Sequence, residues 1–196
     1  IYAALGSVSG IGSSITNAAI AYDRYRTISC PIDGRLNGKQ AAIIVAFTWF
    51  WSMPFTILPF LKIWGRYTTE GFLTTCSFDF LSDDQDTKVF VAAIFTWAYC
   101  IPMSLIIYFY SQLIKSVKLH EKMLREQAKK MNVKSLVSNQ DKERSVEMRI
   151  AKVAFTIFFL FICSWTPYAV VCLTATFGNR ELITPFSSML PAVFAK

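Results

Sequence analysis

The sequence VAFTIFFLFICSWTPYAVVCLTATFGN, residues 153–179, decides the fold, because it contains no Asp, Glu, Lys or Arg. An α-helix needs roughly 20 apolar residues to cross the hydrocarbon core of a bilayer, and this stretch is longer than that. It is apolar on every side, whereas a helix at the surface of a soluble domain carries a polar face. The stretch therefore predicts a membrane-spanning helix.

Three further uncharged runs of membrane-spanning length precede it, at residues 1–22, 40–61 and 89–114, and a shorter one follows at 182–195. Prolines lie in or at the ends of these runs, which membrane helices tolerate because neighbouring groups satisfy the freed carbonyls. With 54% hydrophobic residues, this chain of 196 residues is too apolar for an ordinary soluble domain of its size. It begins without Met inside an apolar run, so we expect an internal piece of a longer membrane protein.

The charged residues between the runs predict the orientation of the helices. Residues 23–39 carry a net charge of +2 and residues 115–152 a net charge of +6, whereas residues 62–88 carry −2. Because basic loops stay in the cytoplasm, we expect 23–39 and 115–152 inside the cell and 62–88 outside it. The chain's net charge of +7 thus reports membrane topology, and the sequence predicts no nucleic-acid partner.

We therefore expect an all-α membrane protein that forms a single bundle over residues 1–196. The third helix should continue beyond the membrane, since apolar residues recur at helical spacing amid charges up to Met131. Alternation in FLTTCSFDF, residues 72–80, predicts a short β-hairpin in the outer loop. The expected helices are about 1–26, 40–61, 87–131, 143–176 and 182–196, with cytosolic loops at 27–39 and 132–142 and an outer loop at 62–86.

Lys196 ends an otherwise uncharged run that starts after Glu181. A lysine in a membrane segment is energetically costly, so its presence indicates a functional site. The five cysteines and the single histidine, His120, lack the spacing of metal ligands, and we expect no metal site. Cys76 differs from the other cysteines because it lies in the outer loop, where disulfides persist.

Two motifs leave a structural and a functional interpretation open. In AYDRYR, residues 21–26, Arg24 could pair with Glu147 at the foot of the 153–179 helix or simply extend toward the membrane surface. In WTPY, residues 165–168, Pro167 should kink the helix, and Trp165 either packs in the core or faces a ligand. From these residues alone the two interpretations of Arg24 are evenly balanced, and core packing is favoured for Trp165.

Taken in order, the motifs resemble the rhodopsin-like G-protein-coupled receptors, from the third to the seventh helix of their seven-helix bundle. The matching set is DRY at 23–25, Trp49 in the next helix, Cys76 in the outer loop, IPMSLIIYFYSQL at 101–113 and WTPY at 165–168. The closing PAVFAK, residues 191–196, is similar to the opsins. HEKMLREQAKKMNV at 120–133 and RIAKVA at 149–154 resemble the rhabdomeric opsins of arthropods, and KSLVSNQDKERS at 134–145 resembles the blue-sensitive opsins of insects.

The resemblance implies a chromophore, 11-cis-retinal or a hydroxylated retinal, bound as a Schiff base to Lys196. Vertebrate visual opsins place its counterion where this chain has Tyr2, so the resemblance makes Glu70 the counterion instead. The sequence alone favours a solvent-facing loop glutamate at 70. For Gly10, the alternative to a place beside the chromophore is a glycine that only lets two helices pack closely. The pocket residues implied by the resemblance are Tyr2, Gly10, Phe95, Tyr99, Trp165, Tyr168, Ala169 and Ala192.

The resemblance also implies a light-activated receptor rather than an enzyme. Cys76 would form a disulfide with a cysteine before Ile1. The expected partners are a heterotrimeric G protein of the Gq type and arrestin, and the expected location is the rhabdomeric plasma membrane, as a multi-pass protein. The activation switch implied by the resemblance is Asp23, Arg24, Tyr25, Tyr110, Glu147 and Pro167.

Two alternatives from other functional classes stay open. One is a retinal photoisomerase, against which the intact DRY motif, Glu147 and the long basic loop favour signalling. The other is a rhodopsin-like receptor for a diffusible ligand, which Lys196 and Glu70 disfavour.

Overall fold

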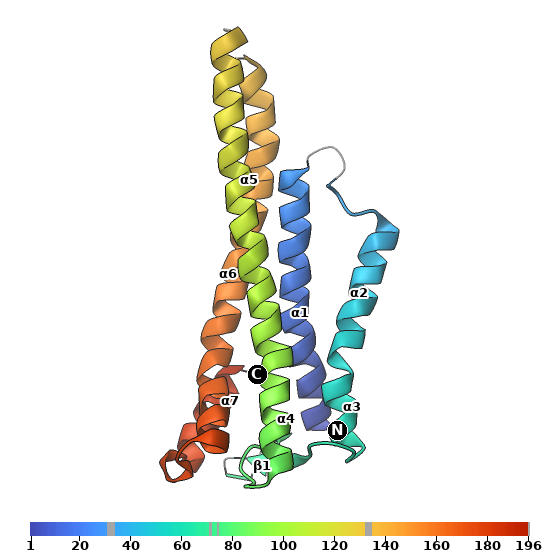
Figure 1. The fold of residues 1–196 in the computed structure, drawn as a ribbon, viewed down its shortest axis with the longest axis vertical. Coiled ribbons are helices and arrows are strands. Elements are labelled where there is room, and N and C mark those ends of the chain that lie inside the picture. Colours follow the sequence, from blue (N-terminus) through green and yellow to red (C-terminus); the bar gives the residue numbers. More distant parts are fainter. Residues whose placement is uncertain (31–33, 71, 74, 132–134, 196) are drawn as a thin grey trace.

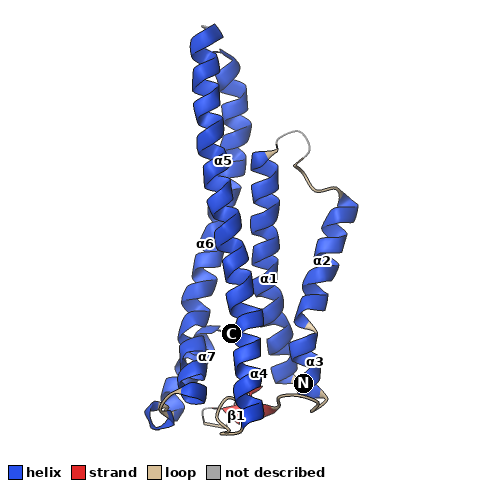
Figure 2. Ribbon diagram, viewed as in Figure 1, coloured by secondary structure: helices blue, strands red, loops and turns tan. Residues whose placement is uncertain are grey.

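The computed structural model of the protein describes residues 1–30, 34–70, 72–73, 75–131 and 135–195. Within these ranges, the side chains of residues 121, 124–125, 127–145, 147 and 180 fall outside the description. The described residues form helices joined by loops, and one small sheet lies at one end of the bundle (Figure 2). This agrees with the all-α bundle and single hairpin that the sequence predicts.

Helix α1 (Tyr2–Ser29) occupies the centre of the bundle and packs against α2 (Gly38–Ser52), α3 (Pro54–Phe60), α5 (Ile101–Met131) and α6 (Ser135–Phe177) (Figure 1). Its buried apolar residues recur at helical spacing on the faces that meet these neighbours. They are Ala3, Ile11, Ile15, Ala18, Ala21 and Ile28.

Three helical segments of the described residues are long and apolar enough to cross a bilayer, namely Gly38–Phe60, Gln85–His120 and Met148–Phe177. Helix α1 has the required length but contains many Ser, Thr, Gly and Asn residues. It can do so because other helices surround it, and small residues at such contacts allow close approach of the helices. The helix at the centre of this bundle thus carries many small and polar residues.

Prolines divide two of the expected helices. The expected helix 40–61 is found as α2 and α3 with Met53 between them, because Pro54 cannot donate the backbone hydrogen bond that would continue α2. The expected helix 87–131 begins as α4 (Gln85–Phe95), passes through a π-helical turn, η1 (Thr96–Cys100), and continues as α5. The π-helical turn directly precedes the segment that contains Pro102.

Helix α6 begins at Ser135, whereas the sequence analysis expects a loop over 132–142 and a helix from about 143. The segment from Ser135 to Lys142 contains neither Gly nor Pro, so nothing in its backbone chemistry prevents the helix from starting early. At the other end of the chain, a 3-10 turn, η2 (Arg180–Leu182), precedes α7 (Pro185–Ala195). Helices α5 and α6 extend together well beyond the other helices (Figure 1).

The outer loop contains the predicted hairpin, formed by β1 (Tyr67–Glu70) and β2 (Thr75–Phe78). The strands are antiparallel, with Glu70 opposite Thr75 and Thr69 opposite Cys76. Gly65 precedes the hairpin with a φ of +69°, and a Cβ atom there would lie 2.7 Å from the ring of Phe90. Only glycine allows the loop to lie this closely on α4. The hairpin lies at the end of the bundle opposite the α5–α6 extension (Figure 1).

Candidate functional site

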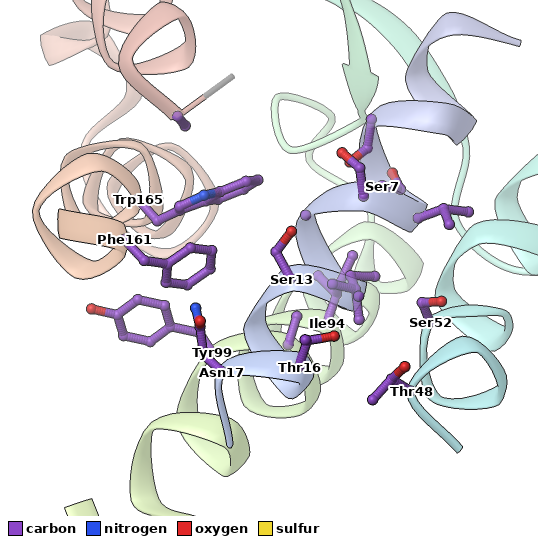
Figure 3. Close-up of a pocket in the computed structure, with 18 of the residues that line it drawn as sticks. Ser7, Ser13, Thr16, Asn17, Thr48, Ser52, Ile94, Tyr99, Phe161 and Trp165 are labelled. Carbon is purple, nitrogen blue, oxygen red and sulfur yellow. The ribbon is translucent and has the colours of Figure 1, made fainter. Parts of the chain in front are cut away.

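A cavity of about 1580 Å³ runs along α1 from Tyr2 to Asp23 and is bounded by α2, α4, η1, α6, α7 and strand β2. Figure 3 shows α1 running through it: Ser13 and Asn17 face Tyr99, Phe161 and Trp165, whereas Thr16 faces Thr48 and Ser52 of α2. The side toward α6 is therefore aromatic, and the side toward α2 carries small polar groups.

The sequence-predicted pocket residues come from five elements, and all of them line this one cavity. Tyr2 and Gly10 are on α1, Phe95 and Tyr99 flank the start of η1, and Ala192 is on α7. Phe95 and Tyr99 stack with ring centroids 5.3 Å apart. The predicted set is Tyr2, Gly10, Phe95, Tyr99, Trp165, Tyr168, Ala169 and Ala192.

Gly10 lies directly against the ring of Trp165. A Cβ atom at position 10 would be 2.6 Å from Cη2 and 2.9 Å from Cζ2 of the indole. Real carbon atoms do not approach this closely, so any other residue would displace the ring. Gly10 was interpreted either as leaving space for a ligand or as letting two helices pack closely. Both interpretations depend on the same contact between Gly10 and Trp165.

Replacing Gly10 with alanine should therefore destabilise the protein by about 1–3 kcal/mol through overpacking. The measurement is the midpoint of thermal unfolding of the full-length protein, with Trp165 fluorescence as a local probe. The matched control is Gly38→Ala at the exposed start of α2, where a Cβ atom would meet nothing within 4 Å. Equal midpoints for the two variants would contradict the close Gly10–Trp165 contact.

Glu70 is 1% exposed, so the carboxylate points into the protein and not into solvent, contrary to what the sequence alone favours. Its Oε2 accepts a hydrogen bond of 2.9 Å from the Tyr168 hydroxyl. The Ser77 hydroxyl lies 2.6 Å from the same Tyr168 oxygen. Since Tyr168 donates its only hydroxyl proton to Glu70, Ser77 must be the donor in the second bond. The three side chains form a hydrogen-bonded chain from β2 through α6 to β1.

A buried carboxylate is costly unless hydrogen bonds or a cation compensate it. The hydrogen bond from Tyr168 supplies part of this compensation. Helix α7 packs against β1, the strand that carries Glu70, and Ala192 and Ala195 of α7 line the cavity. Lys196 follows Ala195 in the sequence and lies outside the described residues. The end of α7 is therefore at the cavity, immediately before the lysine that the sequence analysis singles out.

Asp23, Arg24 and Tyr25 lie in the last two turns of α1, and Tyr110 lies on α5. Arg24 forms an ion pair with the adjacent Asp23. Tyr110 is buried and packs edge-on against Phe155 of α6, with ring centroids 5.2 Å apart.

The other switch residues lie on α1 and α6. Tyr25 stacks on Phe109 at 6.1 Å, and Pro167 lies inside α6. The side chain of Glu147 lies outside the described residues, so its pairing with Arg24 stays a prediction. Cys76 is half-buried and lines the cavity, and the five cysteines form no disulfide with one another. Its disulfide with a cysteine before Ile1 stays a prediction as well.

A polar clamp that the sequence analysis missed closes the outer loop. Arg66, just before β1, donates from Nε to Asp79 at 2.8 Å, pairs with Asp84 and donates to Thr87 at 3.2 Å. Asp84 is the N-cap of α4 and accepts from the Thr87 backbone N–H at 3.0 Å. The clamp thereby ties both ends of the hairpin to the start of α4. The signal in the sequence is a basic residue, Arg66, directly before the hairpin and two acidic residues, Asp79 and Asp84, after it.

The clamp also shifts the pKa of Asp79. Burial acts to raise that pKa, but hydrogen bonds from Ser82, from the Leu81 backbone and from Arg66 outweigh it, and the pKa lies below its ordinary value of 3.8. A lowered pKa means that the folded state binds the ionised form preferentially. The stabilisation from Asp79 is therefore complete above pH 3.8 and is lost as the pH falls through the lowered pKa.

Replacing Asp79 with asparagine should lower the free energy of unfolding at pH 7 by about 2 kcal/mol, since it weakens charge-assisted hydrogen bonds to a buried group. The difference from the wild type should shrink as the pH falls below about 4. Thermal unfolding of the full-length protein across this pH range measures it. Asp83→Asn is the control, because Asp83 is exposed and pairs with Lys88 at the surface, where ion pairs contribute little. A pH-independent difference would contradict the role of the Asp79 charge.

Comparisons with known proteins agree with this arrangement. The family described as 7 transmembrane receptor (rhodopsin family) matches residues 1–195. The chain is 76% identical to the blue-sensitive opsin of Apis mellifera and 68% identical to Opsin-3 of Manduca sexta. Both alignments cover 100% of this chain but 52% and 51% of the relatives, so the chain spans about half the length of the curated relatives it matches.

The solved structure of squid rhodopsin superposes on the chain with a TM-score of 0.91 at 37% identity, covering 99% of this chain and 55% of that one. The superposition confirms the predicted fold class, a part of a seven-helix membrane bundle. The sequence identities confirm the predicted resemblance to the blue-sensitive opsins of insects.

Proposed function

Because the chain belongs to the rhodopsin family of seven-transmembrane receptors, we propose that it forms the chromophore pocket and activation core of a light-activated visual receptor. The observation that carries the proposal is the buried carboxylate of Glu70, which is hydrogen-bonded to Tyr168 of the aromatic cavity at which α7 ends, immediately before Lys196 in the sequence. A lysine in an apolar membrane segment and a buried acid are each costly alone. In this proposal the two charges compensate each other.

The residues of the cavity fit a flat, conjugated, largely apolar ligand. Phe95, Tyr99, Phe161 and Trp165 supply aromatic walls, and the polar groups at the outer end are few and convergent, as is usual in small-molecule sites. Gly10 lets the Trp165 indole lie against α1, where any larger residue at position 10 would displace the ring. These features support 11-cis-retinal, or a hydroxylated retinal, as the chromophore.

In this proposal Lys196 holds the chromophore as a Schiff base, and Glu70 is the anion that favours the protonated, positively charged form of the nitrogen. Tyr168 fixes the orientation of the Glu70 carboxylate, and Ser77 fixes that of Tyr168. Retinal, when bound, would supply a double bond that isomerises on absorbing light. The chain's own part is to hold Trp165 and Tyr168 where a change in ligand shape displaces α6.

The cytosolic end would carry the signal. We infer that Arg24, held by Asp23 and by Glu147, keeps α1 and α6 together in the dark, and that Tyr25 and Tyr110 position these helix ends. A bend at Pro167 would separate them and open a surface for a heterotrimeric G protein. A G protein of the Gq type, arrestin binding and the rhabdomeric plasma membrane follow from the resemblance to arthropod opsins. The same resemblance supports a receptor and not an enzyme.

The test is an absorption spectrum of the full-length protein after incubation with 11-cis-retinal, followed by light-dependent nucleotide exchange on a G protein. A visible band that bleaches or shifts on illumination, together with light-dependent exchange, would support the proposal. A band without G-protein activation would favour a retinal photoisomerase. The absence of any band in well-folded protein would favour a receptor for a diffusible ligand.

A further inference from the structure

Pro102 leaves a backbone carbonyl of the helix before it without its usual donor. In an α-helix the N–H of residue 102 would donate to the carbonyl of Ala98, and proline has no N–H. Ser14 of α1 donates its hydroxyl to this carbonyl at 2.5 Å. Ser14 is 3% exposed, so the bond is inside the bundle. A side chain of α1 thus replaces the hydrogen bond that Pro102 removes from the α4–η1–α5 helix.

Tyr99, the next residue in η1, connects the same irregular turn to α6. Its hydroxyl oxygen lies 2.7 Å from Oγ1 of Thr166. Thr166 donates its only hydroxyl proton to the carbonyl of Ile162 at 2.7 Å. Tyr99 must therefore be the donor to Thr166. The bond has a defined direction, from η1 into α6.

The Tyr99–Thr166 hydrogen bond lies between the cavity and the proline of α6. Tyr99 lines the cavity, and Thr166 lies between Trp165, which also lines the cavity, and Pro167, which interrupts the hydrogen bonding of α6. Figure 3 shows Tyr99 on the same side of the cavity as Phe161 and Trp165. This hydrogen bond thereby joins η1 to the residue that precedes the proline of α6.

We propose that Tyr99 and Thr166 form an interhelical latch that holds the Pro167 region of α6 against η1 in the resting receptor, an inference that rests on the proposed function. Tyr99 and Thr166 are positioning residues: they set the position of α6 and do not react. In this proposal the arrangement described is the resting one. Opening α6 would require the latch to break.

Losing the latch should shift the equilibrium toward the open state about fivefold, which corresponds to the ~1 kcal/mol that a typical hydrogen bond contributes. Tyr99→Phe removes the donor and keeps the ring that stacks on Phe95. Thr166→Val removes the acceptor and keeps the shape of the side chain. The double variant should have no larger effect than either single variant, because both remove the same bond. Thr166→Ser, which keeps a hydroxyl, should behave as the wild type does.

Matched controls are present on the same helices. Thr156→Val makes the same substitution in α6, where Thr156 donates to the Lys152 carbonyl of its own helix at 3.0 Å and lies at the exposed surface. Tyr108→Phe removes a hydroxyl from α5, where the Tyr108 side chain is 55% exposed. Neither control should change the position of α6.

The first experiment needs no chromophore. Hydrogen–deuterium exchange of the retinal-free, full-length protein is measured for the peptide that contains residues 162–170. Exchange in Tyr99→Phe and Thr166→Val should be about fivefold faster than in the wild type, and unchanged in Thr156→Val and Tyr108→Phe. Equal exchange in all variants, or additive effects in the double variant, would overturn the latch.

The second experiment measures nucleotide exchange on the G protein in darkness, with pigment reconstituted from 11-cis-retinal. Dark activity should rise about fivefold in the two latch variants and stay at the wild-type level in the two controls. Unchanged or lower dark activity, in a wild type that light does activate, would overturn the latch while leaving the proposed function intact. A wild type that forms no pigment would overturn the proposed function, and the exchange experiment would then still decide whether the latch exists.

Discussion

Replacing Lys196 with alanine in the full-length protein is expected to abolish covalent binding of retinal completely. A Schiff base needs a primary amine, and Lys196 lies in the sequence directly after Ala195, which lines the cavity. The position also explains why a lysine is tolerated in an apolar membrane segment, where a free ammonium group is costly. The measurement is mass spectrometry of the protein after acid denaturation and borohydride reduction, which fixes any Schiff base as a stable amine.

Lys152→Ala is the matched control, since Lys152 is an exposed lysine of α6 that does not line the cavity. This variant should carry one retinal for each protein molecule, as the wild type does. A retinal adduct on the Lys196→Ala protein in the same assay would show that another amine holds the chromophore. The proposed geometry of the pocket would then be wrong, whatever the activity of the receptor.

Replacing Glu70 with glutamine should lower the pKa of the protonated Schiff base by about 1–3 pH units, the range expected when an opposite charge nearby is removed. Glu70 is almost fully buried, so its charge acts through a medium that screens it weakly. Tyr2, at the position of the vertebrate counterion, cannot replace it, since an unperturbed phenol is neutral at pH 7. The sequence around Tyr2 offers no other acid on the outer half of α1.

The same substitution should move the absorption maximum of the protonated pigment to longer wavelength. An anion close to the nitrogen stabilises the ground state, in which the positive charge is localised there, more than the excited state. A pH titration of absorbance measures both effects in one experiment. Glu181→Gln, which neutralises an exposed glutamate at the same end of the bundle, should change neither. If Glu70→Gln titrates as the wild type does, with the same maximum, Glu70 is not the counterion.

The sequence was sufficient to predict the helices and the hairpin, because both depend on strong local signals. Uncharged runs mark the helices, and alternation marks the hairpin. The eight predicted pocket residues line one cavity. They were chosen from the family resemblance, which contains information on three-dimensional arrangement that composition does not contain. Glu70 shows the difference clearly: as a residue of a polar loop it reads as solvent-facing, and only the folded hairpin places it against Tyr168.

The hydroxyl contacts could not be predicted in the same way. Ser14, Ser77 and Thr166 lie in apolar or mixed segments, where a single small polar residue has no periodic pattern. Their partners are 84, 91 and 67 residues away in the chain, so the bonds exist only once the helices have packed. The early start of α6 was missed for a different reason, since polar residues between two helices are as compatible with a helix as with a loop.

The length of α6 on the cytosolic side of Pro167 makes the helix a lever. Ser135 lies 32 residues before Pro167 in one helix, which at the rise of an α-helix is about 48 Å. A bend of only about 10° at the proline would carry the far end about 8 Å sideways, if the helix stays straight, while atoms beside the proline moved by less than a bond length. A small change in the shape of a ligand next to Trp165 would therefore produce a much larger displacement at the far end of α6.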